Sequence, residues 1–206
     1  VLGLEHLLNK SSRLTLEGFY KKYSQYPISL IDKVSLANKG GGFEILGNEE
    51  IISSGQGESI GIEILFQQKL SKNFYGTFAY TFFNSQFTDL SGKYLPSVWD
   101  SRHLISFSGG YKLKKNWEIS SRWRFSGKTP YVPVNLNTSL ESYPELILNY
   151  NELGNKKLTA LNLLDVRFDK KCNLKRYSLN LYVEIQNILA QTIPRPEEYG
   201  LNRSSS

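Results

Sequence analysis

Residues 58–70, ESIGIEILFQQKL, decide the fold, because apolar and polar residues alternate along them with a period of two. Five of the seven even positions are apolar, whereas the odd positions are mostly polar or small. Alternation of this kind is typical of a β-strand with two unlike faces. A helix would scatter Ile60, Ile62 and Ile64 around its circumference, so the stretch predicts a strand.

The same alternation recurs on both sides of this stretch. A first strand is expected near residues 1–8, which brings the predicted total to about eight strands. The other alternating segments are residues 13–21, 74–82, 102–113, 117–126, 164–169 and 178–186.

The apolar face of these strands has two possible environments. A soluble β-sandwich would bury it against a second sheet, whereas an outer-membrane barrel would turn it to lipid and line a lumen with the polar face. Most expected strands are about 10 to 13 residues long. Strands in globular sheets cluster near 5 or 6 residues, whereas a tilted strand that crosses a bilayer needs about 9 to 11. Strand length therefore favours the barrel.

The connections alternate between short and long. Short polar turns at residues 9–12, 71–73, 114–116 and 171–176 are separated by long stretches at residues 24–56, 88–101 and 127–159. Short turns at one end and long loops at the other are typical of outer-membrane barrels. Aromatic residues also gather near strand ends, as in membrane girdles, although the β propensity of aromatic residues is an alternative explanation.

The direction of the strands predicts that the set is partial. The first strand runs towards a short turn and the eighth runs away from one, so both ends of the chain are expected on the outer side. Eight strands alone would leave two unpaired edges, which hydrocarbon does not tolerate. We therefore expect part of a larger all-β, antiparallel, up-and-down transmembrane barrel over residues 1–188, followed by an irregular tail over residues 189–206.

Composition excludes several other classes. The 206 residues contain one cysteine and two histidines, which gives neither an internal disulfide nor the ligand cluster of a structural zinc site. No run of 18 apolar residues predicts a transmembrane helix, and 13% aromatic residues argue against disorder. The chain starts with Val1 and shows no signal segment, so we expect an internal piece of a longer protein.

Five short motifs occur in a characteristic order. They are GQGESIGIE at residues 55–63, YLPSVWDSRH at 94–103, SGKTPY at 126–131, DVR at 165–167 and EIQN at 184–187. In this order and spacing they resemble the C-terminal barrel strands of TonB-dependent outer-membrane receptors, in versions typical of Bacteroidetes. The resemblance spans residues 4–189.

This resemblance implies a barrel of about 22 strands around an N-terminal plug. It further implies uptake of a small-molecule or metal-chelate substrate, such as a ferric siderophore or cobalamin, across the outer membrane of a Gram-negative bacterium. Outer-membrane lipid and the TonB complex are the implied partners, the latter through a segment ahead of the plug. The sequence departs from the pattern because the plug, the TonB-contact segment and the closing strand with its terminal aromatic residue are absent.

Charged residues at the polar positions of the alternating strands are the main candidates to line the lumen. They could hold the plug or line the substrate path, or they could be solvated ion pairs of the barrel wall. These candidates are Glu63, Arg122, Arg124, Asp165, Arg167 and Glu184, with Asp169 on the same parity. In the long loops, Tyr94, Tyr131 and Tyr143 could pack on a ligand or on one another.

Catalytic readings fail on spacing. Gly127-Lys128-Thr129 resembles the end of a phosphate-binding loop, but Arg122 occupies the position of the required upstream glycine. Asp100, Arg102 and His103 are expected to form a loop corner rather than part of a triad. We expect no enzyme activity, no metal and no cofactor. Nucleic acid is not an expected partner, because the lysines are spread over turns and loops and the net charge is only +6.

Three functions remain open from the sequence. The first is a nutrient uptake receptor of the outer membrane. The second is a passive pore or structural barrel without energy coupling, which a missing plug would favour. The third is a soluble β-sandwich adhesion module, which would bury the apolar face against a second layer of protein.

Overall fold

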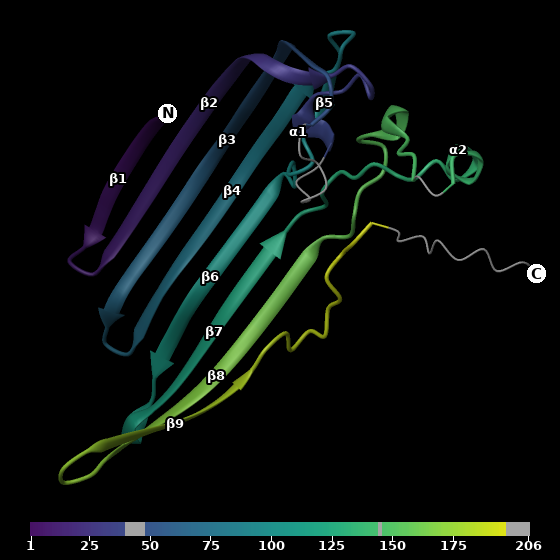
Figure 1. Ribbon diagram of the computed structural model, residues 1–206. Helices are drawn as coiled ribbons and strands as arrows, with labels where there is room; N and C mark the ends of the chain where they lie inside the picture. Colours follow the sequence, from purple (N-terminus) through teal and green to yellow (C-terminus); the bar gives the residue numbers. More distant parts are fainter. Residues whose placement is uncertain (40–47, 144–145, 197–206) are drawn as a thin grey trace, which may run out of the picture.

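The computed structural model describes residues 1–39, 48–143 and 146–196, and its strands form one large antiparallel sheet (Figure 1). Helical segments are short, namely α1 (Leu36–Lys39), α2 (Leu136–Glu141) and the single turns η1 (Lys114–Asn116) and η2 (Tyr150–Glu152). Within these described ranges, no helix is long and apolar enough to cross a membrane. The strands are β1 (Leu2–Asn9), β2 (Ser12–Ser29), β3 (Ile51–Ser71), β4 (Phe74–Thr88), β5 (Tyr94–Pro96), β6 (His103–Lys112), β7 (Trp117–Ser126), β8 (Leu161–Asn173) and β9 (Ser178–Ile185).

The strands follow one another in up-and-down order. The sheet runs β1-β2-β3-β4-β6-β7-β8-β9, every neighbouring pair is antiparallel, and β5 adds to the outer end of β4. In the described part of the chain, β1 pairs only with β2 and β9 only with β8, so the sheet is open. The predicted all-β, antiparallel, up-and-down architecture is therefore confirmed.

The two ends of the sheet differ as the sequence predicts. Short turns join β1 to β2, β3 to β4, β6 to β7 and β8 to β9, and they lie along the lower-left side of the sheet in Figure 1. The described parts of the longer connections, residues 30–39, 48–50, 89–102, 127–143 and 146–160, lie at the opposite end. We call these the turn end and the loop end.

The outer parts of β2 and β3 differ from the sequence prediction. Residues 24–56 are expected to be a loop, but β2 continues to Ser29 and β3 begins at Ile51. Register shifts between Tyr23 and Tyr26 interrupt the alternation, and Pro27 disguises the strand further. The three-residue strand β5 is too short to produce a periodic pattern, so nine strands are found where about eight are expected.

The register keeps the two faces of the sheet distinct. Ile62 lies opposite Gly18 on β2 and Phe82 on β4, and Phe107 lies between Phe78 and Trp123. Ile60 and Ile62 are 53% and 45% exposed, so no second layer of the described chain covers this apolar face. The soluble sandwich requires such a layer, whereas a lipid-facing wall requires its absence.

The loop end contains most of the buried core. Val34, Leu95 and Leu153, one from each long connection, pack together, and Phe87 of β4 is buried beside Tyr23 and Tyr26. Asn38 of α1 donates to the carbonyls of Leu95 and Pro96, at 3.1 and 2.8 Å. The three long connections therefore pack on one another over the loop end of β3 and β4.

Candidate functional site

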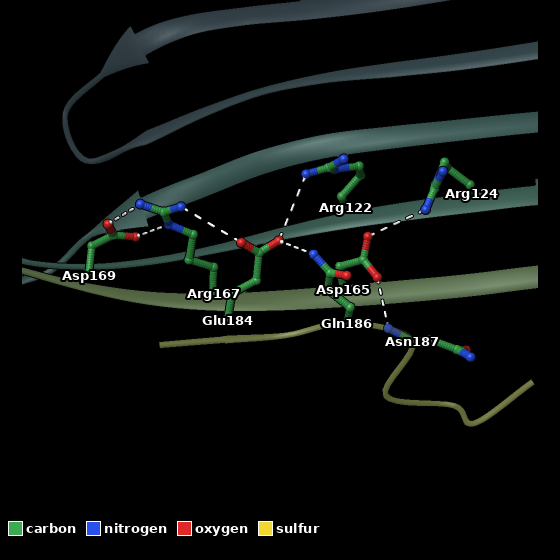
Figure 2. A network of polar contacts seen from close by, with 8 residues as sticks. All are labelled: Arg122, Arg124, Asp165, Arg167, Asp169, Glu184, Gln186 and Asn187. Carbon is green, nitrogen blue, oxygen red and sulfur yellow. Dashed lines mark hydrogen bonds and ion pairs between the residues drawn. The ribbon is translucent and has the colours of Figure 1, made fainter. Parts of the chain in front are cut away.

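A charged network on the polar face links β7, β8 and β9 (Figure 2). The period of two places Arg122 and Arg124 on the same face of β7, and Asp165, Arg167 and Asp169 on the same face of β8. Pairing puts Arg122 opposite Asp165 and Arg167 opposite Glu184. Five of the six predicted lumen candidates therefore meet in one place.

Arg167 is the most firmly held member of this network. Its guanidinium donates to both carboxylate oxygens of Asp169, at 2.9 and 2.8 Å, and it approaches Glu184 at 3.7 Å. The same guanidinium stacks on the ring of Tyr182, 3.8 Å from the ring centroid. A bidentate pair combined with stacking fixes the position of an arginine far more firmly than a single contact does.

The other two carboxylates have several partners each. Asp165, which is buried, accepts a hydrogen bond from the backbone N–H of Asn187 at 2.8 Å and faces Arg124 at 3.5 Å. Glu184 faces Arg122 at 4.0 Å and accepts from the amide of Gln186 at 3.4 Å, in addition to its contact with Arg167. The network therefore connects the end of β9 to the two preceding strands.

The network presents its cations outward and shields its carboxylates. The side chains of Arg122 and Arg124 are 55% and 51% exposed, whereas those of their partners Glu184 and Asp165 are 23% and 10% exposed. The three arginines balance the charge of the three carboxylates, so the network has no net charge. Its exposed surface is nevertheless locally positive, because the arginines are more exposed than the carboxylates. A cavity of about 140 Å³ opens beside Arg122 and Arg167, and a cavity of about 710 Å³ adjoins it towards the turn end.

Glu63, the sixth predicted candidate, lies outside this network. It lies in the middle of β3, opposite Glu17 on β2 and Thr81 on β4, so three steps across the sheet separate its strand from β7. Among the described residues, no cation pairs with Glu63 or Glu17. Two like charges directly opposite each other destabilise a sheet unless water or another group solvates them.

The three tyrosine candidates do not form one cluster. Tyr94 lies in β5 rather than in a loop, Tyr131 is half-buried in the connection after β7, and Tyr143 is exposed beyond α2. Another tyrosine contact was not predicted from the sequence: Tyr75 of β4 donates a hydrogen bond to Glu118 of β7. Tyr75 and Tyr182 could both have been predicted, because each is an aromatic residue at a polar position of an alternating strand.

The loop end holds a second polar cluster that the sequence did not predict. The ammonium of Lys39 bonds to both Asp32 and Glu49 and lies 6.0 Å from the ring centroid of Tyr150. Burial alone would lower the pKa of Lys39, but the two carboxylates outweigh it and raise that pKa. Burial, together with the same carboxylates, raises the pKa of Tyr150. Asp32 and Tyr150 also line a cavity of about 490 Å³ between the loops.

The loop corner before β6 contains two of the three residues that were expected to interact there. Asp100 is buried and pairs with Arg102 at 3.1 Å, and burial raises the pKa of Asp100 although Arg102 opposes that shift. His103 does not join this pair. Its Nδ1 instead lies 2.9 Å from the hydroxyl of Tyr80 on the apolar face. Over the described ranges, no three histidine, cysteine or acidic side chains are grouped so that they could hold a metal ion.

A family model described as "TonB dependent receptor-like, beta-barrel" matches residues 2–188. No curated protein sequence matches the chain. Among solved structures, the ferripyoverdine receptor of the outer membrane of Pseudomonas aeruginosa is similar, with 16% sequence identity and a TM-score of 0.62 over 92% of this chain and 22% of that one.

Two further solved structures are similar to a comparable extent. The siderophore receptor PiuA from Acinetobacter baumannii is 13% identical, with a TM-score of 0.56 over 90% of this chain and 23% of that one. The ferric-catecholate import receptor Fiu from E. coli K12 is 11% identical, with a TM-score of 0.58 over 90% and 22%. At these identities the likeness shows the fold alone, and this chain spans under a quarter of each structure.

Proposed function

The chain belongs to the TonB-dependent receptor β-barrel family, and we propose that the intact protein imports a scarce nutrient through the outer membrane of a Gram-negative bacterium. Residues 1–188 then form part of the barrel wall and residues 189–196 begin the predicted irregular tail, whose remainder, residues 197–206, lies outside the described residues. The apolar face of the sheet contacts lipid, and the polar face looks into the lumen. The observation that carries this proposal is the family match over residues 2–188, together with the bare apolar face.

A ferric siderophore is the substrate class that we favour, with cobalamin or a similar scarce solute as alternatives. The favoured class is supported by the three similar solved structures, which are receptors for ferripyoverdine, for a siderophore and for a ferric catecholate. Energy would come from the TonB complex, as the family name implies. The protein then acts as a receptor and transporter, and its charged side chains bind and position groups rather than react with them.

The polar-face residues take roles within this proposal. Arg122, Arg124 and Arg167, with the carboxylates that face them, line the lumen wall on one side, and Glu63 lines it on another. Tyr94, Tyr131 and Tyr143 belong to the loop end, where a ligand would first arrive. Structural pairing and substrate contact are compatible roles for Arg122 and Arg124, because their side chains are half-exposed.

Localisation and uptake test the proposal in two steps. The intact protein should sediment with the outer membrane and migrate differently on gels before and after heating. Cells should then lose uptake of ferripyoverdine, a ferric catecholate or cobalamin when the gene is deleted, and again when tonB is deleted. Recovery of the protein in the aqueous fraction would refute the membrane role. Uptake that persists without TonB would refute energy coupling and favour a passive pore.

A further inference from the structure

The three arginines of the charged network are held with very different firmness. Arg167 has a bidentate carboxylate partner and a stacked aromatic ring. Arg122 and Arg124 each have one carboxylate contact, at 4.0 and 3.5 Å, and their side chains are about half-exposed. Exposed single contacts contribute little, so these two guanidiniums can turn towards another partner at small cost.

The carboxylates remain paired when the two arginines turn away. Glu184 keeps its contacts with Arg167 and Gln186, and Asp165 keeps the backbone N–H of Asn187. Moving Arg122 or Arg124 therefore leaves no buried carboxylate without a partner, which would otherwise be the main penalty for such a movement.

Hydroxyl groups lie directly across the sheet from both arginines. The register places Ser108 of β6 opposite Arg122, and Ser106 opposite Arg124. Directly opposed side chains have Cβ atoms about 5 Å apart, and residues two positions apart on a strand are about 7 Å apart. Two guanidiniums and two hydroxyls thus form a compact set of donors beside the cavity of about 140 Å³ that Arg122 and Ser108 line.

We propose that Arg122 and Arg124, with Ser106 and Ser108, form a binding site on the polar face for a solute that bears a carboxylate or a comparable oxyanion. Guanidinium groups match the geometry of such oxyanions through paired hydrogen bonds, and the serine hydroxyls add donors from the neighbouring strand. The site deepens the proposed function, on which it rests, because it names an anionic solute as the class that contacts this wall of the lumen.

Binding of citrate to the intact receptor in detergent, measured by calorimetry, tests the site. The variant carrying both Arg122→Gln and Arg124→Gln should weaken binding at least about tenfold, because charge-assisted hydrogen bonds are the strong ones. Arg13→Gln is the matched control. It removes a half-exposed arginine of the same face, which pairs with Glu5 of β1 at 3.2 Å near the opposite edge of the sheet.

The outcomes separate clearly. A loss in the double variant, with Arg13→Gln within about twofold of the unchanged receptor, supports the site. Absence of citrate binding in the unchanged receptor, full affinity in the double variant, or an equal loss in Arg13→Gln overturns it. Heat-dependent gel migration verifies that each variant is folded. TonB-dependent uptake is measured separately, so failure of the anion site leaves the transport proposal to its own test.

Discussion

Arginine introduced at two neighbouring positions, one on each face of the sheet, tests which face meets lipid. Ile64 on β3 lies opposite Leu16 and Tyr80 on the apolar face. The next register pair, Glu63 with Thr81, lies on the polar face. Ile64→Arg and Thr81→Arg therefore introduce the same guanidinium at nearly the same depth but on opposite sides of the wall.

The expected magnitude follows from that depth. A strand crosses a bilayer in about 9 to 11 residues, so Ile64, seven residues before the end of β3 at Ser71, lies inside the crossing but on the loop-end side of its middle. Arginine on the lipid face costs about 2–4 kcal/mol near the midplane and about 0–1 kcal/mol near the interfaces, so Ile64→Arg should cost about 1–3 kcal/mol, which corresponds to roughly 5- to 140-fold in the folding equilibrium. Thr81→Arg faces water and lies opposite Glu63, so its cost should stay within about 1 kcal/mol.

The measurement is the fraction of intact receptor that reaches the heat-resistant folded form in lipid vesicles, over a series of urea concentrations. Ile64→Arg should shift the midpoint strongly to lower urea, and Thr81→Arg should stay near the unchanged receptor. Equal effects of the two substitutions, or a larger effect of Thr81→Arg, would show that our assignment of the lipid face is wrong.

Three further predictions concern packing, pairing and pH. Gly110→Val should lower the free energy of unfolding by about 1–3 kcal/mol in thermal unfolding, because a Cβ there would lie 2.6 Å from the hydroxyl of Tyr75. Gly18→Ala should change that free energy little, because no atom lies within 4 Å of its Cβ. Arg167→Ala should lower the melting temperature more than Arg122→Ala, since only Arg167 has a bidentate, stacked geometry. Burial alone would raise the pKa of Glu49, but the hydrogen bonds that it accepts outweigh burial and lower that pKa below 4.5. The contribution of Glu49 to stability is therefore present above pH 4.5 and is lost as the pH falls further. Hydrogen exchange of residues 30–39 should become faster at that lower pH.

The alternation of apolar and polar residues predicted well which face of the sheet each side chain lies on, because successive residues of a strand point to opposite faces. It could not predict which charged groups would pair. Arg167 takes Asp169 of its own strand as its main partner, although Glu184 lies directly opposite it. That choice depends on side-chain rotamers and on Tyr182, which the alternation does not encode. The loop-end contacts of Lys39 were equally hidden, because they join residues through tertiary packing that leaves no periodic trace.

The isolation of Glu63 has a physical consequence for the polar face. At β7 to β9, Asp165, Asp169 and Glu184 each have a cation or a backbone donor within reach and Glu118 accepts a hydrogen bond from the hydroxyl of Tyr75, so this part of the wall is electrically satisfied by the described chain itself. At β2 and β3 the opposed Glu17 and Glu63 have no such partner among the described residues. Two ionised carboxylates in that position remain tolerable only where water or a cationic group reaches them. The wall at β2 and β3 therefore depends on what fills the space it faces, whereas the wall at β7 to β9 is held by its own pairs and can offer two arginines to a solute.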